Sequence, residues 1–251
     1  MDERLRDIFF DIHADLPRQG PGDDASTVRA LGMCDAVPPA PTILDIGCGP
    51  GMQTLALAKA IPEAQLIAVD FHRPYLEDLD ARAAAADCAD RIDARRADIA
   101  DLPFASGSFD LIWSEGAAYS MGVDEALAAW KPLLRTKGCL AFTELTWLTF
   151  DPPEEAADFF AAEYPAMRDM DAVAAAVEAA GYALLGSFVL PDAAWWTHYY
   201  TPLSDRLPIL DRRYAGDAEA LEIIATAKRE IDIRRRFGDS YGYTFYVARF
   251  A

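Results

Sequence analysis

Residues 44–51 read Leu44-Asp45-Ile46-Gly47-Cys48-Gly49-Pro50-Gly51, an apolar strand that runs into a loop with glycine at every second position. A helical pattern over residues 52–60 follows at once. Glycine lets the backbone approach a ligand closely, and a helix N-terminus favours the ligand's negative part. A dinucleotide fingerprint has the spacing GxGxxG, whereas the third glycine here comes one residue early. The stretch predicts a ligand site and disfavours a nicotinamide-dependent oxidoreductase.

Short apolar runs of strand character alternate with helical patterns from residue 42 onward, which is typical of a parallel sheet covered on both faces. Seven strands are expected, at residues 42–46, 65–69, 92–97, 109–114, 139–146, 183–190 and 243–250. Helices are expected between them, at residues 52–60, 74–87, 124–134, 154–163 and 169–180. The pattern predicts a doubly wound α/β domain in which the last strand is antiparallel.

Two segments fall outside this alternation. Residues 1–40 begin with an amphipathic pattern and predict a helical flap, whereas residues 41–190 form the ligand-binding core. Residues 191–242 separate the last two strands, where a tight hairpin would suffice to join antiparallel neighbours. An insertion of this length usually has a function. Its aromatic run and its charged helix at 218–236 predict a folded cap before the last strand, residues 243–251, within a single domain.

The composition narrows the class of protein. The 251 residues are 52% hydrophobic, and 23 basic against 41 acidic residues give a formal charge of -18, which disfavours nucleic acid and anionic membrane surfaces as partners. The first ten residues carry charges where a signal peptide would be apolar. The four cysteines show no CxxC pair and there is no His cluster, so no metal site is expected. We expect a cytoplasmic protein with reduced thiols.

Four motifs in order, each at an expected strand end, resemble those of class I S-adenosylmethionine-dependent methyltransferases. They are Asp45 with the GxGxG loop, Asp70 after the second strand, Asp98-Ile99 after the third, and residues 102–110 leading into the fourth. The resemblance covers roughly residues 42–190. It implies a Rossmann-like fold, S-adenosylmethionine as methyl donor and S-adenosylhomocysteine as product.

The resemblance also implies roles for individual residues. Asp70, followed by Phe71, would bind both ribose hydroxyls, because a carboxylate only accepts hydrogen bonds and the diol donates two. Asp98 would take the adenine amine, unless Asp101 does so, and Ile99 would pack on the ring. The loop would supply Gly47, Cys48, Gly49 and Gly51. Asp45 either holds the loop amides or lies near the donor's amino group, and Arg18 either binds the donor's carboxylate or is a surface arginine.

A closer resemblance, to bacterial methyltransferases of unassigned substrate, rests on residues 18–22, 115–119 and 241–243. In the wider family the loop after the fourth strand lines the donor's methionine part and the acceptor site, which implies that Glu115 and Tyr119 face the chemistry. The acidic surface disfavours nucleic acid and the cap would restrict bulky partners, so we expect a small-molecule acceptor and a protein that is a monomer or a homodimer. A protein that binds the donor without transferring its methyl group is the alternative.

The reaction that the resemblance implies is an in-line displacement, for which the acceptor atom must be held on the axis of the breaking bond. A base is needed only when the acceptor starts protonated. His198 is the first candidate, because its pKa can fall near neutrality and it lies in an aromatic run; Tyr119, Glu115 and Glu144 follow, and His13 and His72 rank lower. The aromatic run of the cap, Trp195, Trp196, Tyr199 and Tyr200, either forms a cage for a cationic acceptor or is core beneath a lid.

Overall fold

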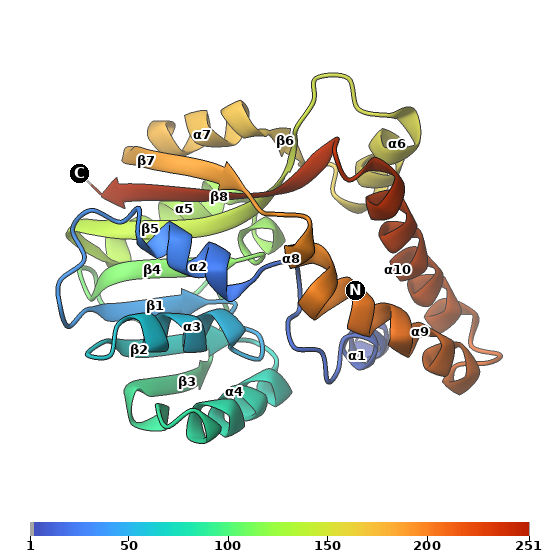
Figure 1. Ribbon diagram of the computed structural model, residues 1–251, viewed down its shortest axis with the longest axis horizontal. Helices are drawn as coiled ribbons and strands as arrows, with labels where there is room; N and C mark the ends of the chain where they lie inside the picture. Colours follow the sequence, from blue (N-terminus) through green and yellow to red (C-terminus); the bar gives the residue numbers. More distant parts are fainter. Residues whose placement is uncertain (1–2, 251) are drawn as a thin grey trace.

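The computed structural model describes residues 3–250 and centres on one twisted sheet (Figure 1). Its strand order is β3-β2-β1-β4-β5-β8-β7, and β6 pairs with β5. The strands are β1 Thr42–Ile46, β2 Gln65–Asp70, β3 Ile92–Arg96, β4 Phe109–Glu115, β5 Leu134–Trp147, β6 Arg168–Asp169, β7 Tyr182–Val189 and β8 Tyr241–Phe250. Strands β1 to β5 pair in parallel, and β8 is antiparallel to both neighbours. The expected Rossmann-like sheet is confirmed, and the two-residue β6 is the strand that the sequence did not indicate.

Helices cover both faces of this sheet. One face packs against α2 (Asp24–Leu31), α3 (Met52–Ala60) and α4 (Arg73–Ala85), and the other against α5 (Val123–Trp130) and α7 (Met170–Ala179). The central strands are apolar on both sides, as a doubly covered parallel sheet requires. In β4, for example, Leu111 and Trp113 pack on the first face, whereas Ile112 packs on the second.

A second group of helices lies beyond the carboxyl ends of the parallel strands (Figure 1). It contains α1 (Glu3–Ile12), α6 (Glu154–Glu163), α8 (Ala193–Trp195), α9 (Thr201–Arg213) and α10 (Ala218–Phe237), and its shared apolar core joins Phe160, Tyr200 and Ile224. Residues 191–242 are thus helical, as expected. Helix α6, expected among the helices that cover the sheet, packs instead against α10.

The N-terminal helix is tied to this group by polar contacts. The carboxylate of Asp11 accepts hydrogen bonds from Arg213 Nη1 at 2.6 Å and from the Tyr214 hydroxyl at 2.8 Å. Arg206 donates from Nη2 to the backbone oxygen of Asp11 at 2.8 Å. Helix α1 is therefore held beside α9, and it also contacts α10. Its residues Phe9 and Phe10 share a cavity with the ends of β1, β2 and β4. In open α/β sheets this point, where the strand order reverses, is where ligands bind.

Candidate active site

The glycine loop makes a tight turn from β1 into α3 along a path that side chains could not follow. Gly47, Gly49 and Gly51 have φ angles of +70°, +53° and +83°. A Cβ on Gly47 would lie 2.3 Å from Cβ of Ala117, and one on Gly51 would lie 2.2 Å from Cδ1 of Leu79. Left-handed backbone and close approach both require glycine here. The turn therefore presents bare backbone above the sheet.

The turn is held by its neighbour β2. The backbone nitrogens of Gly47 and Cys48 both donate to the carbonyl of Val69, at 2.8 and 3.0 Å. The next residue, Asp70, accepts from the backbone nitrogens of Gly49 at 2.9 Å and His72 at 2.8 Å, one on each carboxylate oxygen. Burial raises the pKa of Asp70. Each oxygen retains acceptor capacity, so Asp70 can still receive hydrogen bonds from a diol.

A cavity of about 410 Å³ lies over these strand ends. Most residues that the sequence assigned to donor binding line it, namely Arg18, Gly47, Cys48, Gly49, Asp70, Phe71, Asp98, Ile99 and Glu115. Gln19, Gln53 and Tyr75, which the sequence reasoning missed, also line it, and the Tyr75 hydroxyl donates to Gln19 Oε1 at 2.6 Å. Gln19 lies inside the 18–22 motif, so the motif itself could have pointed to it.

Two predicted donor-binding residues do not line this cavity. Asp45 lies beneath the turn, fully buried, where it accepts from Thr54 Oγ1 at 2.5 Å, and Gln53 Nε2 lies 3.5 Å away. Burial raises the pKa of Asp45 to about 7. Of its two expected roles, the geometry favours support of the loop. Gly51 packs against α4 and closes the turn.

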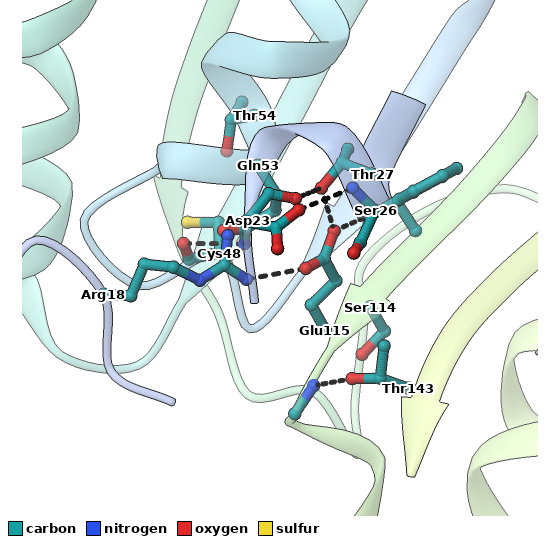
Figure 2. Close-up of polar contacts among 12 residues, drawn as sticks. Arg18, Asp23, Ser26, Thr27, Cys48, Gln53, Thr54, Ser114, Glu115 and Thr143 are labelled. Carbon is teal, nitrogen blue, oxygen red and sulfur yellow. Dashed lines mark hydrogen bonds and ion pairs between the residues drawn. The ribbon is translucent and has the colours of Figure 1, made fainter. Parts of the chain in front are cut away.

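Arg18 and Glu115 form a buried ion pair in which Arg18 Nη2 donates to Glu115 Oε2 at 2.6 Å (Figure 2). The other carboxylate oxygen accepts from Thr27 Oγ1 at 2.7 Å and Trp113 Nε1 at 2.8 Å. Both carboxylate oxygens of Glu115 are thus engaged by three donors, one of them the Arg18 guanidinium, so the geometry favours a structural role over the expected role as a base. Arg18 Nη1 is buried and has no hydrogen-bond partner among the described residues. A ligand carboxylate would satisfy it.

The far end of the cavity is open to solvent. Asp98 lies there after β3, and its Oδ1 accepts from the backbone nitrogen of Ala100 at 2.9 Å. The exposed ring of Phe71 lies on the same rim, with the Arg96 guanidinium 4.8 Å from its centroid. Of the two carboxylate oxygens of Asp98, only Oδ1 has a hydrogen-bond partner among the described residues, so Oδ2 can accept from a ligand, and Ile99 offers an apolar side chain; these are the two properties that the expected adenine contact requires.

A second cavity, of about 420 Å³, adjoins the first. The two share the lining residues Phe9, Gln19, Gly20, Gly116 and Tyr119. Aromatic side chains dominate the rest of its wall, namely Phe159, Phe160, Tyr164, Trp195, Tyr199, Tyr200 and Tyr243. Of the cap aromatics, Trp195, Tyr199 and Tyr200 thus line a cavity and Trp196 does not.

The predicted base, His198, lines neither cavity, which corrects that expectation. It lies on the π-helical turn Trp196–Tyr200. Tyr199 and Tyr200 of this turn are buried, whereas His198 is partly exposed. Successive residues on a helix point in different directions, so the turn that brings the two tyrosines inward carries His198 away. Glu144 also lines neither cavity; it accepts from the Tyr164 hydroxyl at 2.7 Å.

His13 lines the second cavity instead. Its Nδ1 lies 2.8 Å from the carbonyl of Phe9, and since a carbonyl only accepts, Nδ1 carries the hydrogen. Nε2 is therefore the acceptor nitrogen, and it accepts a hydrogen bond from the Tyr199 hydroxyl at 3.4 Å. Burial lowers the pKa of His13, which favours the neutral ring. The amphipathic pattern of the N-terminal helix could have identified His13 as inward-facing, one turn after Phe9.

Tyr119 follows the Glu115 strand end and lines both cavities. Desolvation raises its pKa, so the hydroxyl stays protonated at neutral pH. Within residues 3–250, no group of three or more His, Cys, Asp and Glu side chains is arranged to hold a metal ion. No helix in that range combines the length and the apolar character needed to cross a membrane.

Comparison with known proteins identifies the domain. Residues 43–138 match the methyltransferase domain family. The chain is 30% identical over 167 residues to the cypemycin N-terminal methyltransferase of a Streptomyces species, covering 63% of this chain and 64% of that protein. It spans 37% to 64% of the length of the first three curated relatives that it matches.

Solved structures extend the likeness to nearly the whole chain. The E. coli protein YjhP superposes with a TM-score of 0.82 at 16% identity, covering 96% of this chain and 98% of that one. An S-adenosylmethionine-dependent methyltransferase from Geobacter sulfurreducens, solved with S-adenosylhomocysteine, gives a TM-score of 0.79 at 17% identity and covers 98% of both chains. Residues 43–138 thus match the methyltransferase domain family, and nearly the whole chain shares the fold of an S-adenosylmethionine-dependent methyltransferase.

Proposed function

We propose that this protein transfers the methyl group of S-adenosylmethionine to a small-molecule acceptor. The observation that carries the proposal is the pairing of two adjoining cavities, one polar and lined by the glycine turn, Asp70 and Arg18, the other aromatic. They meet at Tyr119, Gln19 and Gly116. A donor in the first cavity and an acceptor in the second would bring their reacting ends together at that junction.

The first cavity offers a partner for each part of the donor. Asp70 would accept from the ribose hydroxyls, and Asp98 with Ile99 would bind the adenine. Arg18 Nη1, which has no partner among the described residues, would bind the donor's carboxylate. The bare backbone of the turn lets the ligand approach. Asp45 and Gly51 would support the turn from outside the cavity.

S-adenosylmethionine supplies an electrophilic methyl group on a positively charged sulfur. The protein's part is to hold an acceptor atom in line with that group and to exclude water. The segment before residue 40 and the cap would close over the acceptor, since α1 and α9 both contribute to the second cavity. When the acceptor carries a proton, His13 Nε2 would receive it, because that nitrogen is an unprotonated acceptor in the cavity wall and its hydrogen bond from the Tyr199 hydroxyl is long, at 3.4 Å.

The acceptor class follows from charge and enclosure. The net charge of -18 disfavours nucleic acid, and cap helices cover the aromatic cavity, which disfavours a bulky partner. We also propose that the protein acts in the cytoplasm, as a monomer or homodimer. The cytoplasmic location is supported by the four cysteines, Cys34, Cys48, Cys88 and Cys139, which are free thiols, as is usual in a reducing compartment.

The test is incubation of the purified protein with methyl-labelled S-adenosylmethionine and a bacterial small-metabolite extract, followed by mass spectrometry. Label should appear in one metabolite with the intact protein and not with Asp70→Ala. Calorimetry with S-adenosylmethionine and with NAD runs in parallel. Binding of NAD in place of S-adenosylmethionine would favour an oxidoreductase, and donor binding without transfer to any metabolite would favour a sensor.

A further inference from the structure

The second cavity is lined by acidic side chains and by no basic side chain of the described residues other than His13. Its ionisable side chains, apart from the tyrosines, are His13, Glu163 and Glu230, and no described lysine or arginine lines it. The one buried donor of its wall that lacks a partner in the described chain is Trp195 Nε1, which is neutral. A carboxylate or phosphate on the acceptor would therefore meet two carboxylates and no cation. Anionic acceptors are disfavoured by this charge balance.

Glu230 is the more enclosed of the two carboxylates. Its Oε1 accepts a hydrogen bond from the Tyr200 hydroxyl at 2.6 Å, and no ion pair to it is formed by the described residues. Desolvation raises the pKa of Glu230, and the nearby Glu163 carboxylate raises it further. A partly buried carboxylate without a cation is stabilised when a ligand brings the missing positive charge.

The aromatic side chains of the second cavity also favour a cationic ligand. The rings of Tyr199 and Tyr200 stack with centroids 4.9 Å apart, whereas Trp195, 5.7 Å from Tyr200, already carries the Arg234 guanidinium 4.0 Å from its own centroid. Phe159 and Phe160 from α6 face the same cavity. Aromatic faces attract cations through their negative quadrupole, and together they offer a large apolar surface to the body of a ligand.

We propose that the second cavity binds the methyl acceptor as an organic amine with an apolar body, and that the Glu230 carboxylate is the counter-charge for its nitrogen. This inference rests on the methyltransferase function proposed above and assigns that function a substrate class. The name of the 30% identical relative, an N-terminal methyltransferase, is compatible with a nitrogen acceptor.

The charge balance of amine methylation suits such a cavity. The lone pair of the acceptor nitrogen forms the new N–C bond, and the C–S bond breaks with its electron pair on sulfur. The positive charge thereby moves from the donor to the nitrogen. Because an ammonium has no lone pair, one proton leaves the bound nitrogen before this attack, to His13 Nε2 and then to solvent. Because the nitrogen gains charge during transfer, the Glu230 carboxylate stabilises the transition state as well as the bound ammonium.

The experiment uses the full chain saturated with S-adenosylhomocysteine, whose binding is measured first. Phenethylamine, tryptamine and hexylamine are then titrated by calorimetry, each beside the alcohol and the carboxylic acid that carry the same body. We expect each amine that binds to exceed its alcohol by about tenfold or more in affinity, and the acids not to bind. Glu230→Gln keeps the acceptor for the Tyr200 hydroxyl and should shrink the amine-to-alcohol ratio about tenfold.

The matched control is Glu222→Gln, which removes the same charge from an exposed position of α10 and should leave the ratio unchanged. Failure of S-adenosylhomocysteine to bind would count against the proposed function itself. If it binds, the inference is overturned when no amine binds, when an acid binds as well as its amine, or when Glu230→Gln leaves the ratio unaltered.

Discussion

Arg18 Nη2 lies 2.6 Å from Glu115 Oε2, although the two residues are 97 positions apart in the chain. The pair joins the loop between α1 and α2 to the carboxyl end of β4, and its side chains are 5% and 0% exposed. Such a pair is weak evidence for net stability, since desolvating both charges offsets their attraction. Its importance is positional: it fixes the guanidinium at the donor cavity with Nη1 left for a ligand.

Arg18→Met should weaken binding of S-adenosylhomocysteine by about 10- to 100-fold, because a charge-assisted hydrogen bond to the ligand's carboxylate is lost. 5′-Methylthioadenosine has the same adenine and ribose but no carboxylate, so its affinity should change far less. Calorimetry with both ligands measures the contrast. Equal weakening of both would show that Arg18 acts only by shaping the cavity.

The same substitution leaves Glu115 buried without its cation. Arg18→Met should therefore lower the free energy of unfolding by roughly 3 kcal/mol. Adding Glu115→Gln should restore part of this loss, since Gln can still accept from Thr27 or Trp113 without a buried charge. Urea unfolding of the two single variants and the double variant gives the comparison. A double variant no more stable than Arg18→Met would contradict the assigned role of the pair.

Asp70→Asn should weaken both S-adenosylhomocysteine and 5′-methylthioadenosine by about 10- to 100-fold, because both carry the ribose diol and the amide cannot accept from both hydroxyls. This distinguishes Asp70 from Arg18 within one assay. Asp78→Asn, which removes the same charge from an exposed position of α4, serves as the control and should bind both ligands normally. Unchanged affinity in Asp70→Asn would remove Asp70 from the ribose site.

The strand ends and the glycine loop were predictable because their signals are local. Asp70 ends one expected strand and Asp98 follows the next, while Asp45 lies one residue before the end of the first, and in a parallel sheet all such ends lie on one edge. The spacing of the glycines likewise reports the left-handed backbone of a single turn. Residues near one another in sequence thus sufficed to predict the sheet, and the resemblance to the methyltransferase family pointed to most of the residues that line the first cavity.

The acceptor cavity could not be predicted in the same way. Its wall brings together Phe9 and His13 from the N-terminal segment, Phe160 from α6 and Tyr200 from the cap, which meet only through tertiary packing. Helical periodicity shows that α6 has an apolar face, but it does not show whether that face packs on the sheet or on the cap helices. For the same reason an aromatic run made His198 attractive, although the π-turn directs its neighbours inward and leaves it outside.

Glu144→Gln should stabilise the protein in a pH-dependent manner. Burial raises the pKa of Glu144 to about 7, above its ordinary value of 4.5, so the folded state holds a proton that the unfolded state releases. Stability from this group is present below about pH 4.5 and is lost as the pH rises towards 7. The variant keeps an acceptor for the Tyr164 hydroxyl and loses this penalty.

The expected gain over the natural protein is small at pH 5 and reaches up to about 3 kcal/mol at pH 8. Urea unfolding at both pH values measures it, with Glu178→Gln on the exposed side of α7 as the matched control. A gain of equal size at both pH values would mean that ionisation of Glu144 is not its cause.

His13→Asn should lower turnover by at least tenfold while leaving affinity for S-adenosylhomocysteine within about twofold, because a proton acceptor near the reacting atom contributes to rate and not to donor binding. The Asn amide can still donate to the Phe9 carbonyl, so the local fold is kept.

The pH profile of turnover adds a sharper readout. Burial and the Arg206 guanidinium both lower the pKa of His13 below its usual 6.5, while the hydrogen bond to Phe9 opposes them. Turnover of the natural protein should therefore fall only when acid protonates Nε2, and the variant should lack that fall. His198→Asn, outside both cavities, is the control and should behave as the natural protein. Loss of turnover in His198→Asn but not in His13→Asn would identify His198, in the cap, as the base.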